Sequence, residues 1–461
     1  MEILTKWATW LNDMLWSDVL MALLLGCALW FTLKSRFVSF RMIPEMFRLV
    51  LRSGKREKGI SSFEAFIISL AGRVGTGNLA GVATAVVIGG PGAVFWMWLI
   101  ALLGSATAFF ECTLAQLYKV KGEKNFIGGP AYYMLHGARM KGLATFFALL
   151  SAVCFGVAYN SVHSNTICAA CQQAFSVDPH VLGGFLFVMT LLIIFGGIQR
   201  IAKVSSILVP IMACGYILLA FVVIALNIDK IPALFQEIIG QAFGLRPMVG
   251  GGLGAAFLQG IRRGLYSNEA GMGTSPNVAA TAVVSHPVKQ GLIQAFGVFV
   301  DTLVICTATA FIILVSPVQM DGSVNGIQLT QLALENEIGF GATVYVACTV
   351  LMFAFSTILS NYYYGESNLR FFTQNKTVLL VYRIMAAGVV FFGSIASLEL
   401  AWSLADIATG VMTLCNLIAI VFLTRPVVRL LKDYVSQRKQ GKDPEYKVSN
   451  TPGIEGDVSC W

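Results

Sequence analysis

The sequence predicts an all-α polytopic membrane protein with eleven transmembrane helices, one leading helix followed by two sets of five. Three observations lead to this fold class. Of the 461 residues, 56% are hydrophobic and only 12% are charged, whereas an average soluble domain carries about 25% charged residues. The apolar residues fall into windows of roughly 20, the length that crosses a bilayer core. Basic residues collect in alternate loops between these windows.

The apolar windows follow one another along the whole chain. They begin near residues 16, 62, 93, 143, 181, 204, 250, 291, 340, 377 and 402. The first leads into a basic segment and lacks a small-residue cleavage pattern, so we expect a retained helix and no signal peptide. The positions of the windows divide the chain into four parts. We expect the leading helix with a basic cytoplasmic loop at 1–58, the two five-helix sets at 59–228 and 229–425, and a cytoplasmic tail at 426–461.

The charges of the loops predict the orientation, because lysine and arginine are retained on the cytoplasmic side. The loops at 176–180 and 316–340 are neutral or acidic and include Asp321. We therefore expect the amino terminus outside and the carboxyl terminus inside a bacterial inner (plasma) membrane. The net charge of +8 fits this role and gives no reason to expect a nucleic-acid partner. The basic loop after the leading helix contains Lys34, Arg36, Arg41, Arg48, Arg52, Lys55, Arg56 and Lys58.

Two of the predicted spans are interrupted by glycine and polar residues. In the second span, Ala71–Asn78 separates Phe66–Leu70 from Leu79–Ile88. In the seventh, Arg262–Gly273 separates Gly250–Ile261 from Thr274–Val284. Unpaired backbone groups are costly in lipid, so a broken helix persists only where the freed groups line a cavity or bind something. Matching interruptions at the start of each five-helix set are typical of the central site of a transporter.

The first interruption offers sites for an anion and a cation together. A half-helix that begins near Asn78 directs unpaired N–H groups and the positive end of its dipole to mid-membrane, which suits a carboxylate. A half-helix that ends near Gly72 leaves carbonyl oxygens free, which suit a hard cation such as sodium. Alternatively, Gly75 and Gly77 serve only close helix packing.

The second interruption carries an acid within the membrane, Glu269. Such a residue is a candidate for function, but it could equally neutralise Arg73, Arg262 or Arg263. Asp301 and Asp406, in the eighth and eleventh spans, are expected to be packing or network carboxylates rather than ligands.

Four segments resemble the sodium:alanine symporter family, also called the alanine or glycine:cation symporters. The segments are Val74–Thr84, Gly89–Trp98 with Gly104, Ser267–Gly273 and Phe353–Thr357. The resemblance extends from about Leu23 to Arg425. It implies a leucine-transporter-type fold, in which the two five-helix sets are inverted repeats, and sodium-coupled import of a neutral amino acid by alternating access.

The resemblance also implies roles for particular residues. Thr76, Gly77 and Asn78 would hold the substrate carboxylate, with Leu265 and Tyr266 as walls of the pocket. The sodium ion, the expected coupling ion, would bind the carbonyls of Ala71 and Val74 and the hydroxyls of Ser356 and Thr357, with Asn78 as a further candidate. Thr357 would serve the ion or the substrate amine.

Two residues depart from the family pattern at positions that face the substrate. His163 stands where members commonly have glutamine, and Asn361 stands where they commonly have tryptophan. An asparagine enlarges the pocket and adds a donor and an acceptor, so both changes favour a larger polar substrate such as glutamine or asparagine. A buried neutral role for His163, and refilling of the space by Tyr362–Tyr364, remain alternatives.

Other functions fit the sequence less well. A channel needs a continuous polar pore, whereas polarity here gathers at two interruptions. An enzyme is not expected, because the histidines at 136, 163, 180 and 286 form no known catalytic or metal-ligand spacing. A proton-coupled amino-acid symporter is the nearest rival. The sequence leaves the oligomeric state open.

Overall fold

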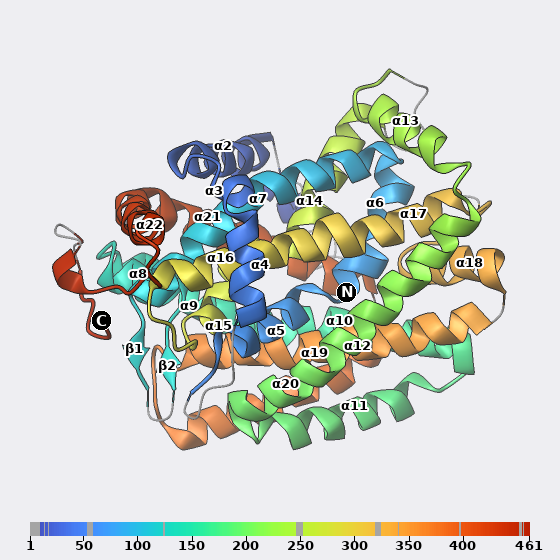
Figure 1. Cartoon of the computed structure of the whole chain (residues 1–461). Coiled ribbons are helices and arrows are strands. Elements are labelled where there is room, and N and C mark those ends of the chain that lie inside the picture. Colours follow the sequence, from blue (N-terminus) through green and yellow to red (C-terminus); the bar gives the residue numbers. More distant parts are fainter. Residues whose placement is uncertain are drawn as a thin grey trace.

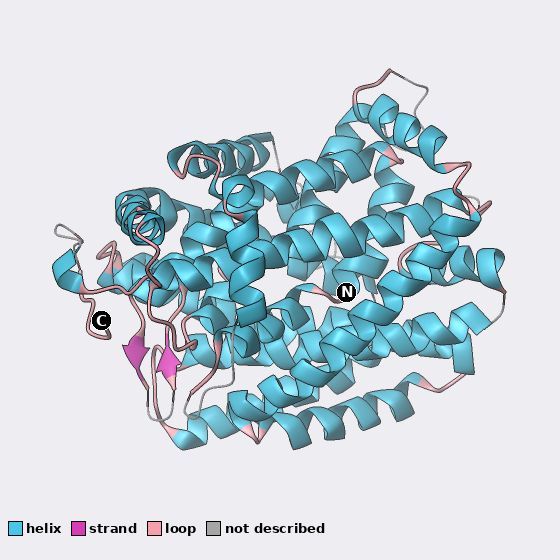
Figure 2. Ribbon diagram, in the orientation of Figure 1, coloured by secondary structure: helices cyan, strands magenta, loops and turns pink. Residues whose placement is uncertain are grey.

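The computed structural model is helical over nearly all of its described length (Figure 2). It describes residues 10–12, 14–16, 18–52, 59–122, 125–245, 252–318, 324–339, 341–395, 398–450, 454 and 456–461. Four residues named above, Lys55, Arg56, Lys58 and Asp321, lie outside these ranges, as does the predicted start of the seventh span near residue 250.

Helices occur at all eleven predicted positions. Their starts agree closely with the prediction, and the largest departure is at α12, which was expected from residue 204 and begins at Gly197. In chain order they are α2 (Asp18–Lys34), α5 (Ser62–Arg73) with α6 (Val82–Gly89), α7 (Gly92–Leu117), α9 (Lys141–Val153) with α10 (Tyr159–Phe175), α11 (Pro179–Ile194), α12 (Gly197–Leu226), α14 (Gly252–Asn268) with α15 (Ser275–Ala279), α16 (Pro287–Val298) with α17 (Thr307–Val315), α19 (Gly341–Leu369), α20 (Lys376–Ile395) and α21 (Leu398–Phe422).

The prediction of an all-α polytopic membrane protein is confirmed. Among the described residues, seven helices are long and apolar enough to cross a membrane, and the pair α5–α6, bent by 45°, adds an eighth if it is counted as one span. Large apolar side chains are exposed along α11, α12 and α20, such as Phe185, Phe221 and Phe392, where they would meet lipid. α11 runs along the lower edge of the molecule in Figure 1 and contacts both α12 and α20.

Three of the described helices contain π-helical segments, and two of these segments, η1 and η3, contact each other at the first interruption. They are η1 (Gly77–Gly81), η2 (Cys154–Ala158) between α9 and α10, and η3 (Phe299–Cys306) between α16 and α17. Such segments are rare and occur often at functional sites. η1 contains Asn78 and η3 contains Asp301, and the two side chains are hydrogen-bonded.

Glycines bring α14 close to α7 behind the interruptions. A Cβ at Gly260 would lie 2.4 Å from the carbonyl oxygen of Ala93, and one at Gly264 would lie 2.7 Å from the Ile100 side chain. Two small residues four apart form one face of a helix and let two backbones approach. Larger residues at either position would push α14 away from α7.

Several shorter elements were not expected from the sequence. The segment 316–340, predicted as a loop, contains α18 (Ile327–Ile338). The predicted tail, residues 426–461, contains most of α22 (Thr424–Lys439), which buries one side against the other helices. Windows of about 20 apolar residues do not detect short amphipathic helices. The other additions are α3 (Val38–Arg41), α4 (Ile43–Arg52), α8 (Pro130–His136), α13 (Ile231–Ala242), η4 (Val448–Asn450) and the hairpin β1 (Val120–Lys121) with β2 (Phe126–Ile127).

Candidate substrate and cation site

The first interruption lies where the sequence predicts it. A capping box starts α5, in which the Ser61 hydroxyl accepts from the Glu64 N–H and the Glu64 carboxylate accepts from the Ser61 N–H. α5 ends at Arg73, Val74 is extended with ψ 91°, and helix resumes as η1 at Gly77. Backbone groups between Ala71 and Gly77 therefore lack some of their helical partners.

The two glycines of this interruption lie against side chains and backbone of other helices. A Cβ at Gly75 would lie 2.4 Å from the Thr357 hydroxyl and 3.4 Å from His163 Cε1. A Cβ at Gly77 would lie 3.0 Å from Cα of Ser267. Close approach is thus required here, and it also brings α5 and η1 next to α10, α14 and α19.

Asn78 connects the interruption to η3. Its side-chain oxygen accepts a hydrogen bond from the Gly75 N–H at 2.9 Å. Its amide nitrogen donates to the Asp301 carboxylate at 2.7 Å. The other carboxylate oxygen of Asp301 accepts from the hydroxyls of Ser267, at 2.9 Å, and Thr302, at 2.8 Å. Asp301 therefore belongs to a hydrogen-bond network, as predicted. It also contacts Asn78 directly, a residue that the resemblance places in the substrate site.

Three of the four predicted sodium ligands converge. The Thr357 hydroxyl donates to the Ala71 carbonyl at 2.8 Å and lies 3.4 Å from the Val74 carbonyl. These atoms come from α19 and from the end of α5, two helices in different predicted sets. Ser356 does not reach the interruption in this conformation, because its hydroxyl donates to the Phe353 carbonyl on its own helix at 2.8 Å.

Aromatic and polar side chains surround the same place. The Thr76 hydroxyl is 3.0 Å from His163 Nδ1. The ring of Tyr266 stacks on Tyr159, with centroids 5.2 Å apart, and lies 4.9 Å from Trp402. Leu265 is also buried. Thr76, His163 and Tyr266 therefore lie beside the interruption, as the resemblance implies.

Several polar groups near the interruption are buried without a hydrogen-bond partner among the described residues, and two of them belong to predicted selectivity residues. These are the Nε2 atom of His163 and both amide atoms of Asn361. Asn361 is wholly buried and lies one helical turn after Thr357 on α19. An unpaired buried amide costs about 1–3 kcal/mol, so this position is suited to pairing with a polar ligand.

The second interruption starts later than predicted. α14 continues through Arg262 and Arg263 to Asn268, and the break comprises only residues 269–274. The prediction began the break at Arg262 because two charged residues stood within an apolar span. Both arginines are paired with a buried carboxylate, so the helix continues through them. Within the break, Glu269, Gly271 and Gly273 have φ values of 56°, 86° and 86°.

A carboxylate on α7 holds this second break. Glu111 is wholly buried and accepts hydrogen bonds from the N–H groups of Gly271 and Gly273, each at 3.2 Å. It also accepts from the Asn416 amide at 2.8 Å. The sequence reasoning missed this role. The available signal was an acid within the apolar span 92–117, which is rare without a function or a structural partner.

Asp406, not Glu269, neutralises the arginines of α14. The Asp406 carboxylate lies 2.6 Å from Arg262 and 2.9 Å from Arg263. Arg73 instead donates to the Ser275 hydroxyl at 2.7 Å and to the Gln294 carbonyl at 2.9 Å. Asp406 is therefore a network carboxylate, as predicted.

Asp406→Asn is expected to lower the free energy of unfolding by about 3 kcal/mol, because two buried cations lose their counter-charge. Thermal unfolding in detergent measures this change. Asp178→Asn is the matched control, since Asp178 is an exposed helix cap and asparagine caps equally well. An equal shift for both variants would contradict the role of Asp406.

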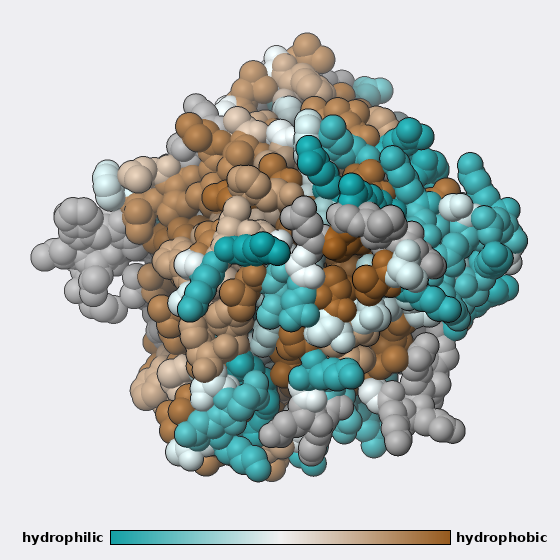
Figure 3. All heavy atoms as spheres, turned by 90° about the vertical axis from the view of Figure 1, so that its left-hand side faces the viewer, coloured by the Kyte–Doolittle hydropathy of each residue, from teal (hydrophilic) through white to brown (hydrophobic). Residues whose placement is uncertain are grey.

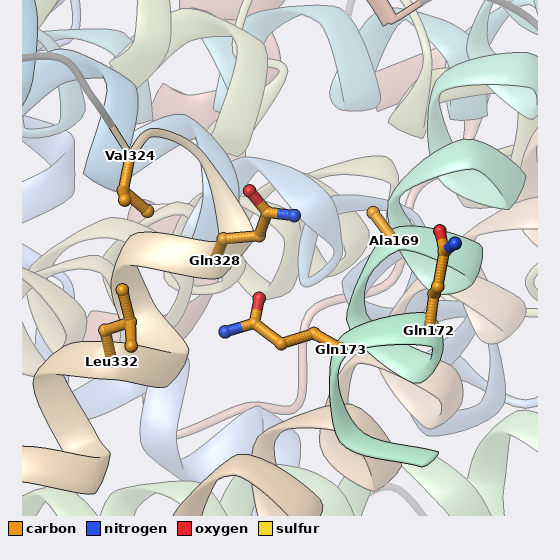
Figure 4. A pocket seen from close by; sticks show the side chains of 6 residues that line it. All are labelled: Ala169, Gln172, Gln173, Val324, Gln328 and Leu332. Atoms are coloured by element: carbon orange, nitrogen blue, oxygen red, sulfur yellow. The ribbon is translucent and has the colours of Figure 1, made fainter. Parts of the chain in front are cut away.

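A separate cavity lies at the ends of α10 and α18. It has a volume of about 340 Å³ and is lined by Ala169, Gln172, Gln173, Val324, Gln328 and Leu332. Figure 4 shows the side chains of Gln173 and Gln328 directed toward the space between the two helices. No predicted site residue lines this cavity.

In comparisons with known proteins, the family model and two relatives all describe amino-acid symporters or carriers. The sequence profile of the sodium:alanine symporter family matches residues 1–448. The chain is 49% identical to the probable sodium/glutamine symporter GlnT of Bacillus subtilis (strain 168), covering 98% of this chain and 94% of that protein. It is 38% identical to the sodium/proton-dependent alanine carrier protein of Bacillus sp. (strain PS3), covering 88% and 94%. The crystal structure of MhsT with L-phenylalanine has a TM-score of 0.57 at 14% identity, covers 87% of this chain and 93% of that one, and shares the fold.

Proposed function

Because the chain belongs to the sodium:alanine symporter family, and is therefore a cation-coupled amino-acid symporter rather than an enzyme, we propose that its coupling ion is sodium. One observation carries this proposal. The Ala71 and Val74 carbonyls and the Thr357 hydroxyl converge on one point. Such uncharged oxygen ligands suit a hard monovalent cation. Ser356 would complete the set by turning its hydroxyl.

The substrate carboxylate would bind at the same interruption. Thr76, Gly77 and Asn78 begin the half-helix after it, whose N–H groups and dipole favour an anion. Ion and substrate would then share a few residues of one broken helix. The ion also touches α19, so its binding favours conformations that bring α5 and α19 together.

Transport would follow alternating access between two inverted five-helix repeats, residues 59–228 and 229–425, after a leading part at 1–58. We further infer eleven spans, an outside amino terminus, and a cytoplasmic tail at 426–461, in a bacterial inner membrane. The basic loops and the matching positions of the two breaks support this arrangement.

The proposed substrate is a neutral amino acid with a polar side chain, glutamine being the leading candidate. The unpaired Asn361 amide offers one donor and one acceptor, which a carboxamide matches. The relative named as a probable sodium/glutamine symporter is consistent with this choice.

The double substitution His163→Gln with Asn361→Trp is expected to shift preference toward alanine by about tenfold. The indole would fill the space left by the smaller side chain and remove the amide pair, and a methylene-sized difference in fit is worth about 1–3 kcal/mol. Competition of alanine and glutamine for uptake measures the shift. His180→Gln, at an exposed position of α11, is the control. An unchanged preference would place selectivity elsewhere.

Uptake into proteoliposomes tests the function directly. An imposed sodium gradient without a pH gradient should drive accumulation of labelled glutamine, and a proton gradient without sodium should not. Accumulation driven only by protons would refute sodium coupling. Failure of both gradients with every neutral amino acid would refute the substrate class.

Proton coupling is the second candidate, and Asp301 favours it. This wholly buried carboxylate is hydrogen-bonded to Asn78, so protonation there would reach the proposed carboxylate site through one contact. The relative named as a sodium/proton-dependent alanine carrier gives the same alternative.

A further inference from the structure

A strongly basic cavity lies between the end of the leading helix and α22. Its volume is about 300 Å³. It is formed by the turn that joins α2 to α3 and by one face of α22, segments about 400 residues apart in the sequence. Its lining consists of five cations, Lys34, Arg36, Arg41, Lys432 and Lys439, together with Ser35, Val428, Leu431, Val435 and Ser436.

In the part of the chain that the structure describes, the cations of this cavity are not neutralised by carboxylates. Among the described residues, none of the five forms an ion pair. The nearby acid Glu45 is already bound, since it pairs with Arg48 and Arg438 at 3.2 Å each and accepts from the Tyr434 hydroxyl at 2.6 Å. Five positive charges around one cavity repel one another, and an anion bound there would relieve that repulsion.

Apolar side chains lie exposed beside the same cavity. Leu33, Phe37 and Phe40 are 52%, 50% and 42% exposed and belong to the α2–α3 segment. Trp30 is 44% exposed, and the Lys34 ammonium lies 4.2 Å from its ring. Figure 3 shows hydrophobic and hydrophilic side chains adjoining on the end of the molecule that carries α22. The position thus combines fixed positive charge with a surface for hydrocarbon.

We propose that this cavity binds the phosphate headgroup of an anionic phospholipid, with its acyl chains against Leu33, Phe37 and Phe40. Basic pockets at the ends of membrane helices recognise anionic headgroups. A free phosphate would use the cations but leave the exposed apolar side chains unpaired, so the lipid is the occupant that fits both. The bound lipid would join the leading helix to α22, independently of which ion drives transport.

Titration of delipidated protein with phosphatidylglycerol tests the proposal, with binding followed by native mass spectrometry. The triple variant Arg36→Gln, Lys432→Gln, Lys439→Gln should bind this lipid roughly a hundredfold more weakly, since each nearby cation contributes about fivefold. The matched control is Arg139→Gln, Lys203→Gln, Lys376→Gln, which removes the same charges from exposed positions outside the cavity. It should bind within about twofold of the unmodified protein.

Three binding results would overturn the proposal. The first is equal weakening by the two triple variants, which would indicate nonspecific attraction. The second is equally tight binding of zwitterionic phosphatidylcholine. The third is competition by inorganic phosphate at the same concentration as the lipid, which would indicate a soluble ligand. In lipid-free detergent the cavity variant should unfold at a midpoint no lower than that of the control variant, because it has lost part of the repulsion among the cations. A lower midpoint for the cavity variant alone would mean that these side chains serve stability, which would also contradict a direct headgroup contact.

Discussion

Asp301→Asn is expected to reduce glutamine uptake by roughly a hundredfold, because the charged acceptor that positions Asn78 is lost. Asn78 donates to one carboxylate oxygen, and the Ser267 and Thr302 hydroxyls donate to the other. An amide turned to accept from Asn78 directs its NH₂ toward the two hydroxyls, which can rotate to accept. The variant should therefore fold, with weaker hydrogen bonds around Asn78 and a lower substrate affinity.

Two measurements separate the roles that Asp301 could have. Under sodium coupling, counterflow exchange should show a raised half-saturation for substrate, with the pH profile unchanged. Under proton coupling, the same variant should retain exchange and lose its response to a pH gradient. Thr302→Val is the control, since it removes one donor to the carboxylate but keeps its charge. Normal uptake by Asp301→Asn would exclude Asp301 from both mechanisms.

Thr357→Ala is expected to raise the sodium concentration for half-maximal uptake by about tenfold, the effect of losing one ligand worth about 1.4 kcal/mol. Its hydroxyl is the group that reaches the Ala71 and Val74 carbonyls from α19. Thr357→Ser keeps the hydroxyl and should stay within about twofold of the original value. Uptake at graded sodium concentrations measures both.

The neighbouring Ser360 provides a matched control. Its hydroxyl donates to the Ile68 carbonyl at 2.9 Å, so it makes the same kind of contact between α19 and α5 one turn away. Ser360→Ala should affect stability as Thr357→Ala does but leave the sodium dependence unchanged. Equal sodium shifts in the two variants would mean that helix packing, not ion binding, is being measured.

Much of the fold could be predicted because its signals are local. Runs of about 20 apolar residues predict helices wherever they occur, and the starts of α5, α19 and α20 agree within one residue with the predicted 62, 340 and 377. The first break was predictable for the same reason. Gly75, Gly77 and Asn78 lie within four consecutive residues, so the sequence alone shows that they weaken a helix at this point.

What could not be predicted depends on contacts between distant residues. Arg262 and Arg263 indicate a broken helix until their partner Asp406, 143 residues beyond Arg263, is placed beside them. Likewise, Asp301 is bonded to Asn78 across 223 residues of sequence. An acid inside a span predicts that it has a partner, but only the packing of α7 against the break after α14 shows which backbone groups Glu111 binds.

The hydrogen bond from Thr357 to the Ala71 carbonyl has a consequence for the speed of the transport cycle. To present its oxygen to an ion at the proposed site, the hydroxyl would turn its donation away from the Ala71 carbonyl and toward the Phe353 carbonyl, 2.9 Å away on the same helix. When the ion leaves, the donation to the Ala71 carbonyl can form again, so a hydrogen bond within the protein would replace the contact with the ion. A coupling ion must leave at every turnover, and a site that holds it too tightly stalls. At the proposed site, Thr357 would therefore both bind the ion and compete with it for the Ala71 carbonyl, which would ease release of the ion.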